Sequence, residues 1–146
     1  MKLPVCCLLA IALSSVMCAV LDQRILKLTE VMKELNLLNR GVQHNGLRLS
    51  TPTSDVEECC ALKALSCFRE NLQLLPAANK RHQHKLTKSL KSQMIVNSVN
   101  TCSQEETQNA TCPRCDSFPK RDSREFVREL ESLLQKTYSR LVERED

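Results

Sequence analysis

The sequence predicts an all-α domain, a short-chain four-helix bundle in up-up-down-down order with two long crossover loops, stapled by disulfides. Three observations carry this prediction. Apolar residues recur at helical spacing in four separate stretches. Six cysteines remain once a predicted leader is set aside, and the 146 residues include only two glycines and one tyrosine. A turn-rich all-β fold would use both of these residue types more often.

Residues 1–19 are predicted to be a secretory signal peptide, followed by one domain over residues 20–146. Lys2 precedes an apolar run from Leu3 to Met17, and small residues follow at Cys18 and Ala19. The alternative is a membrane anchor, but this run is shorter than the roughly 20 apolar residues that a spanning helix needs. The protein is therefore expected to be secreted and extracellular, without membrane insertion.

The first two helices are predicted from apolar periodicity and from their ends. In the first, from about Asp22 to Asn39, apolar residues alternate in steps of four and three. The second is expected to begin after the segment Pro52–Asp55, which has a capping-box pattern with acidic residues behind it. Pro76 ends this second helix.

The last two helices flank a polar, cysteine-bearing connection. The third is expected from Lys80 to Val99, and the connection from Asn100 to Lys120 contains prolines that block a long helix. The fourth is predicted from Ser123 to about Val142, with Asp122 as its cap and Glu125 completing a capping box.

The lengths of the connections determine the predicted topology. The connection between the first two helices is long enough to return along the bundle, so these helices can run parallel. The next connection is short and forces an antiparallel pair, and the last is again long enough to cross over. Long, short and long connections are typical of an up-up-down-down bundle.

Two cysteine pairs have matching separations. Cys60 and Cys67 are seven residues apart, so on a helix they share a face at a distance of about 10.5 Å. Cys112 and Cys115 can span about 10 Å if their segment is extended. The match favours bridges from Cys60 to Cys112 and from Cys67 to Cys115, and the crossed pairing stays open.

The remaining two cysteines, Cys59 and Cys102, are candidates for a third bridge. Cys59 points about 100° away from Cys60 on a helix, so it needs a different partner. Free thiols and intermolecular pairing are the alternatives to this bridge.

A secreted redox protein is the alternative interpretation of Cys112-Pro-Arg-Cys115. A redox-active pair of this kind follows a strand and opens a helix, but no strand pattern precedes it, and Pro119 separates it from the fourth helix. The second ligand pair of a zinc site is also missing from the sequence. No metal, cofactor or catalytic residue is predicted, so the protein is not expected to be an enzyme.

Charge gives weaker indications. The net charge of +4 falls by one unit if Lys2 leaves with the leader, which is too balanced to indicate nucleic-acid binding. The basic run from Lys80 to Lys91 fits a solvated face, an acidic receptor or a glycosaminoglycan. A membrane-active basic helix is disfavoured by the many acidic residues.

Asn109-Ala110-Thr111 is an N-glycosylation sequon in a predicted loop, which makes Asn109 a candidate glycan site.

Short motifs carry a family resemblance. They are Val56-Glu57 with Cys60 and Ser66-Cys67-Phe68, Thr111-Cys112-Pro113 with Cys115-Asp116-Ser117, and Glu125-Phe126 with Ser132-Leu133-Leu134-Gln135-Lys136. In these motifs the chain resembles the short-chain four-helix cytokines of the interleukin-2, interleukin-15 and interleukin-21 family. The order of the cysteine spacings is most similar to the interleukin-21 branch. The first helix and the region between the second and third align only by pattern.

The resemblance implies a secreted signalling protein that acts as a monomer, without catalysis or a cofactor. It would bring together a private receptor, an interleukin-21-type receptor alpha chain, and the common cytokine receptor gamma chain. Their Janus kinases would then activate STAT proteins in lymphocytes. Another cytokine of the interleukin-2 or interleukin-15 type is the nearest alternative.

The resemblance also assigns receptor contacts. Gln135 and Tyr138 fall at the positions that contact the common gamma chain, although the family has an aliphatic residue where Tyr138 stands. The positions assigned to the private receptor are Leu26, Lys27, Met32, Lys88 and Lys91. Glu30, Cys59 and Cys102 depart from the family pattern.

Overall fold

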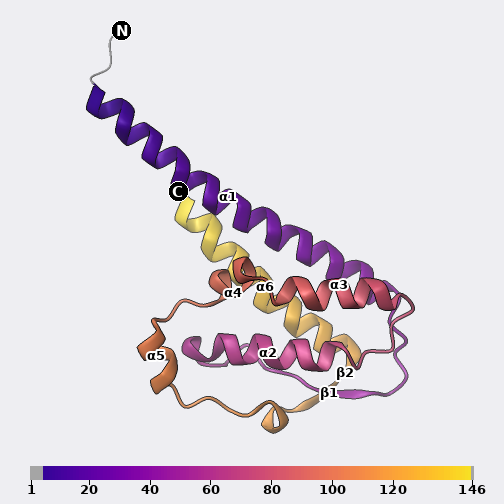
Figure 1. The fold of residues 1–146 in the computed structure, drawn as a ribbon. Helices are drawn as coiled ribbons and strands as arrows, with labels where there is room; N and C mark the ends of the chain where they lie inside the picture. Colours follow the sequence, from indigo (N-terminus) through magenta and orange to yellow (C-terminus); the bar gives the residue numbers. More distant parts are fainter. Residues whose placement is uncertain (1–4, 146) are drawn as a thin grey trace.

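The computed structural model describes the backbone of residues 5–145 and the side chains of residues 23–143. Helices α1 and α2 run in one direction, and α3 and α6 run back, as Figure 1 shows. The predicted helical bundle with disulfide staples is therefore confirmed. The elements in chain order are α1 (Val5–Arg40), β1 (Arg48–Ser50), η1 (Glu58–Cys60), α2 (Ala61–Leu72), α3 (Lys80–Leu90), α4 (Gln93–Val99), α5 (Gln104–Asn109), η2 (Cys115–Ser117), β2 (Lys120–Asp122) and α6 (Ser123–Glu145).

Helix α1 is longer than expected, because it begins at Val5 and continues through the predicted leader into the first predicted helix. Leu28, Val31, Leu35 and Leu38 form its buried stripe. No helix in the described residues is long and apolar enough to cross a membrane. Cleavage of a signal peptide stays a prediction.

The second predicted helix starts later than the sequence suggested. The 3₁₀ turn η1 precedes α2, and the residue before η1, Glu57, makes no side-chain cap. The Thr53 hydroxyl instead donates to the Asp55 carboxylate, and this bond holds the pKa of Asp55 below its usual value. The predicted capping box at this position is therefore wrong, and Thr53–Asp55 forms a local turn.

The third predicted helix is divided into α3 and α4. Asn79 caps α3 by accepting a bond of 3.0 Å from the His82 backbone N–H. Ser92 then starts a new helix, since its hydroxyl accepts from the Ile95 backbone N–H at 3.4 Å. Both pieces bury their apolar faces, with Leu90 and Ile95 fully covered on either side of the break.

The connection between α4 and α6 contains three short elements that were not predicted, α5, η2 and β2. Helix α5 begins with a capping box: the Ser103 hydroxyl accepts from the Glu106 N–H at 3.1 Å, and the Glu106 carboxylate accepts from the Ser103 N–H at 3.0 Å. The bond from the Ser103 N–H lowers the pKa of Glu106. Strands β1 and β2 pair antiparallel, with Arg48 opposite Asp122, and so join the two crossover loops.

Helix α6 agrees with its prediction. The Asp122 carboxylate accepts a bond of 2.9 Å from the Glu125 N–H, which caps the helix and lowers the pKa of Asp122. The carboxylate of Glu125 faces Arg121 at 3.7 Å, so the second half of the expected capping box is replaced by an ion pair. The apolar stripe of α6 is buried, and its Phe126 packs edge-on against Phe68 of α2 at 5.5 Å between ring centroids.

Three disulfides fasten the segment between α4 and β2 to η1 and α2. Two of them are the pairings that the cysteine spacing favoured, and the crossed arrangement is not formed. The third joins Cys59 to Cys102, for which free thiols and intermolecular pairing were the alternatives. The bonded cysteines have Cα–Cα distances between 5.3 and 5.5 Å, within the usual range for a bridge. The pairs are Cys59–Cys102, Cys60–Cys112 and Cys67–Cys115.

Candidate receptor-binding surfaces

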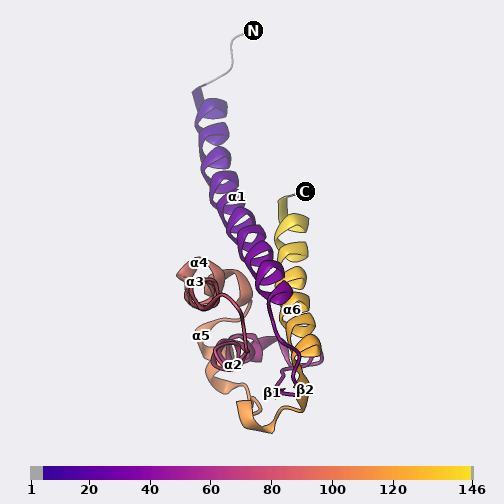
Figure 2. The same cartoon turned by 90° about the vertical axis from the view of Figure 1, so that its right-hand side faces the viewer.

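Helix α1 lies between α3 on one side and α6 on the other, as Figure 2 shows. Glu34 marks the side of α1 that faces α3, since its carboxylate lies 3.3 Å from the Lys85 ammonium. The backbone carbonyl oxygen of Glu34 is also 3.1 Å from Nε2 of His82, which lies on α3 with Lys85. We name this side of α1 the α1–α3 seam and the opposite side the α1–α6 seam.

The two residues assigned to the gamma chain lie at one edge of α6. Gln135 is exposed, and its side-chain amide donates to the Glu131 carboxylate at 3.2 Å. Tyr138 is half-buried and packs against the core. Residues three apart on a helix are about 60° apart around its axis, so Gln135 and Tyr138 form one surface.

The three residues of α1 assigned to the private receptor do not share a face. Leu26 points to solvent with 67% of its surface exposed. Lys27 is seven residues before Glu34, and so lies on the α1–α3 seam, where it faces Glu30 at 3.9 Å. Met32 is half-buried against the core, about 140° around the helix from Lys27 and toward the α1–α6 seam.

The two lysines of the third helical segment also differ in position. Lys88 is exposed on the outer face of α3. Lys91 follows the end of α3 and lies beside α2, where it lines a shallow pocket with Arg69 and Glu70. The structure therefore places Lys27 and Lys88 on adjacent helices on the same side of α1, whereas Lys91 lies farther around, toward α2.

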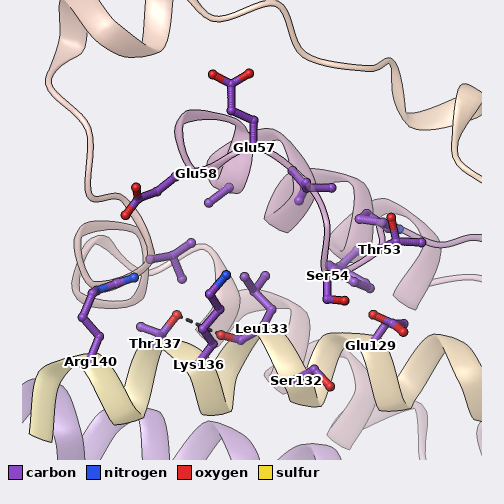
Figure 3. A pocket seen from close by; sticks show the side chains of 16 residues that line it. Thr53, Ser54, Glu57, Glu58, Glu129, Ser132, Leu133, Lys136, Thr137 and Arg140 are labelled. Atoms are coloured by element: carbon purple, nitrogen blue, oxygen red, sulfur yellow. Dashed lines mark hydrogen bonds between the residues drawn. The ribbon is translucent and has the colours of Figure 1, made fainter. Parts of the chain in front are cut away.

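A pocket of about 360 Å³ lies between η1 and α6, as Figure 3 shows. By helical periodicity, the α6 residues that line it, such as Leu133 and Lys136, lie on the other side of the helix from Gln135 and Tyr138. Apolar side chains from α2, α4 and α6 line it, among them Phe68, Val99 and Leu133. Charged residues from two elements surround these apolar side chains. They are Glu57 and Glu58 at η1, and Glu129, Lys136 and Arg140 on α6.

Some of the polar groups that line this pocket already form hydrogen bonds within the protein. The Thr137 hydroxyl donates to the Leu133 carbonyl at 2.9 Å within α6, and the Arg140 guanidinium donates to the Ser98 carbonyl. An apolar floor with a rim of mixed charge can receive an apolar side chain of a partner. The sequence does not predict this pocket, because its walls come from η1 and α6, which are far apart in the chain.

The cysteines provide covalent restraint in this structure. The sulfur atoms of Cys59 and Cys102 lie close to the Glu106 carboxylate, in a group that could hold a metal if both thiols were free. They are joined to each other at 2.01 Å, so they are not thiolate ligands. Cys112 and Cys115 are bonded to separate partners on η1 and α2, which does not fit a redox pair.

The predicted glycan site lies at the end of α5. Asn109 is the last residue of this short helix, and both Asn109 and Thr111 are exposed. The expected loop begins one residue later, at Ala110. The sequon is therefore accessible, and its occupancy stays a prediction.

A comparison with protein families places these features in one context. The family model of interleukin 15 matches residues 8–138. This range includes the cysteines of the three bridges described above and ends at Tyr138, so it contains both residues assigned to the gamma chain. The match covers most of the chain, from within the predicted leader into α6.

Proposed function

Because the chain belongs to the interleukin 15 family of cytokines, we propose that it is a secreted cytokine of the interleukin-21 type. It binds an interleukin-21-type receptor alpha chain as its private receptor, and the common cytokine receptor gamma chain. As a monomer, it brings these two chains together, and their Janus kinases then activate STAT proteins in lymphocytes. The support for this finer assignment is the interleukin-21-like order of the cysteine spacings.

The separation of the two proposed contact surfaces carries the proposal. Gln135 and Tyr138 lie at an edge of α6, whereas Lys27 and Lys88 lie on the α3 side of α1. A helix with its side chains is about 10 to 12 Å across, so two receptor chains can approach from opposite sides of α1 without overlapping there. Since Met32 lies toward α6, the private contact rests mainly on Lys27 and Lys88.

Two further features belong to this proposal. Residues 1–19 act as the signal peptide, and residues 20–146 form the secreted domain. Asn109 carries an N-linked glycan, because its sequon is exposed on the crossover connection.

The variant Gln135→Asp with Tyr138→Asp tests the gamma-chain surface. We expect this variant to keep its binding to the private receptor ectodomain and to lose its binding to the gamma-chain ectodomain. It should therefore fail to induce STAT phosphorylation in cells that display both receptor chains. The reason is that two carboxylates would replace an amide and a half-buried aromatic ring, and would be desolvated without partners in the complex.

The matched control is Gln104→Asp with Gln108→Asp, which adds the same charges to exposed positions on α5. Binding of each ectodomain alone and of both together, with far-UV circular dichroism of each variant, separates a lost contact from a lost fold. Unchanged STAT phosphorylation with the folded α6 variant would refute the assigned surface.

A further inference from the structure

The outer face of α3 carries only basic side chains. Each exposed residue of this helix is Lys, Arg or His. No aspartate or glutamate occurs in residues 71–104, which include all of α3 and α4. The exposed residues of α3, together with the residue after its end, are Lys80, Arg81, His84, Lys85, Lys88 and Lys91.

These charges form a line along the helix. Arg81, Lys85 and Lys88 lie within about 60° of one another around the axis and span about 10 Å along it. Lys80 and Lys91 lie at one edge of this stripe and extend the basic surface to about 16 Å. The spacing therefore suits a ligand that presents negative charges repeatedly along an extended chain.

Acidic neighbours neutralise little of this surface. Glu34 pairs with Lys85 at 3.3 Å, and its own side chain is almost fully buried. Glu70 lines the shallow pocket beside Lys91 without forming an ion pair within 4.0 Å. Among the described residues, none of the salt bridges involves Lys80, Arg81 or Lys88. These ammonium and guanidinium groups are thus available to an external anion.

Away from Lys88, which the proposed receptor contact uses, the composition of the face favours a polysaccharide over a second protein partner. Protein interfaces concentrate their binding energy in buried aromatic and aliphatic anchors, and lysine is depleted from them. The exposed face of α3 offers no such anchor. A run of lysine and arginine can instead bind a linear polyanion by releasing its condensed counterions.

We propose that the outer face of α3 binds a sulfated glycosaminoglycan chain. The choice of this polyanion rests on the proposed secretion, since sulfated polysaccharides are the most densely charged linear polyanions of the extracellular matrix. The bound chain would retain the protein at cell surfaces and cover Lys88 and Lys91. Lys80 and Arg81 lie outside the proposed receptor contacts, so they provide an independent test.

The test measures binding of the full secreted protein to heparin oligosaccharides at several NaCl concentrations. We expect Lys80→Ala with Arg81→Ala to weaken binding at least about tenfold at physiological salt. The slope of log Kd against log salt should fall by about 1.4 to 1.8, if each lost contact removes about 0.7 to 0.9 as it does for nucleic acids. The control, Arg124→Ala with Arg128→Ala, removes the same charge from exposed positions on α6 and should change the affinity less than about twofold.

Other polyanions distinguish the ligand class. Desulfated heparin should bind weakly or not at all, and polyglutamate of equal charge should bind more weakly than heparin. Equal losses from both double variants, equal binding of polyglutamate, or no heparin binding at physiological salt would each overturn the proposal. No receptor is present in this assay, so its result is independent of the receptor assignment, and circular dichroism verifies that each variant is folded.

Discussion

Lys85 is predicted to stabilise the contact between α1 and α3 by compensating a buried carboxylate. The Glu34 side chain is only 6% exposed, whereas that of Lys85 is 63% exposed, and the two charges lie 3.3 Å apart. Neither carboxylate oxygen of Glu34 makes an oriented hydrogen bond with any described residue. The ammonium of Lys85 is therefore the main compensation for this negative charge.

The expected cost of Lys85→Ala follows from this asymmetry. Removing one partner of a fully buried ion pair typically costs about 3 to 5 kcal/mol, because the other charge stays desolvated. Water reaches the exposed Lys85 and would partly reach Glu34 after truncation, so we expect about 1 to 2 kcal/mol. In a domain of this size, that loss lowers Tm by roughly 4 to 8 °C.

A second variant distinguishes charge compensation from lost packing. Glu34→Leu should be neutral or stabilising, and Glu34→Leu with Lys85→Ala should restore at least the stability of the unsubstituted protein, since no buried charge remains. Guanidinium unfolding at pH 7 with intact disulfides, followed by circular dichroism, measures all four proteins. If Lys85→Ala lowers the free energy of unfolding by the same amount whether residue 34 is leucine or glutamate, the aliphatic part of Lys85 stabilises the contact and its charge does not. That result would refute this prediction.

Two further predictions concern the helix cap and the third bridge. The Glu125 N–H lowers the pKa of Asp122 in the folded state, so this stabilisation is complete above the ordinary aspartate pKa of about 4 and is lost as pH falls through the folded value. Asp122→Asn keeps a cap acceptor that does not titrate, so Tm should fall less steeply on acidification than in the unsubstituted protein. An unchanged slope of Tm against pH below about pH 4 would contradict this. Serine at both Cys59 and Cys102 should cost about 3 kcal/mol, because Cys60–Cys112 already restrains this segment and the extra loop is short. A loss under about 1 kcal/mol in urea unfolding would show that this loop is restrained without the bridge.

The sequence predicts those parts of the fold where one strong local signal agrees with packing. Helix α6 is the clearest case, because Asp122 caps it and an apolar stripe with helical spacing continues to Leu141. Strands β1 and β2 have no such signal, since each is three residues long and is defined only by its partner. Helix α5 has a readable capping box at Ser103, but it buries no side chain, so periodicity could not find it.

The candidate surfaces were harder to predict than the helices, because a helical pattern does not say which neighbour each edge will meet. Lys27 and Met32 both flank the buried stripe of α1, and only the positions of α3 and α6 assign them to different seams. The break at Ser92 has a similar effect, because it ends α3 and leaves Lys91 beside α2. The cysteine spacing, by contrast, could be interpreted from the sequence alone, because Cys60 and Cys67 share a face within one continuous segment.

The distribution of the disulfides explains why exposed substitutions can report on binding. Each bridge between described side chains joins η1 or α2 to the segment between α4 and β2, whereas the described side chains of α1, α3 and α6 include no cysteine. These three helices carry the proposed receptor and polysaccharide contacts, and they are held together by fully buried residues such as Leu28, Leu90 and Leu134. Substitution of an exposed residue such as Gln135 or Lys80 leaves both the bridges and these packed residues in place. Its main effect should therefore fall on association, with little change in the free energy of unfolding.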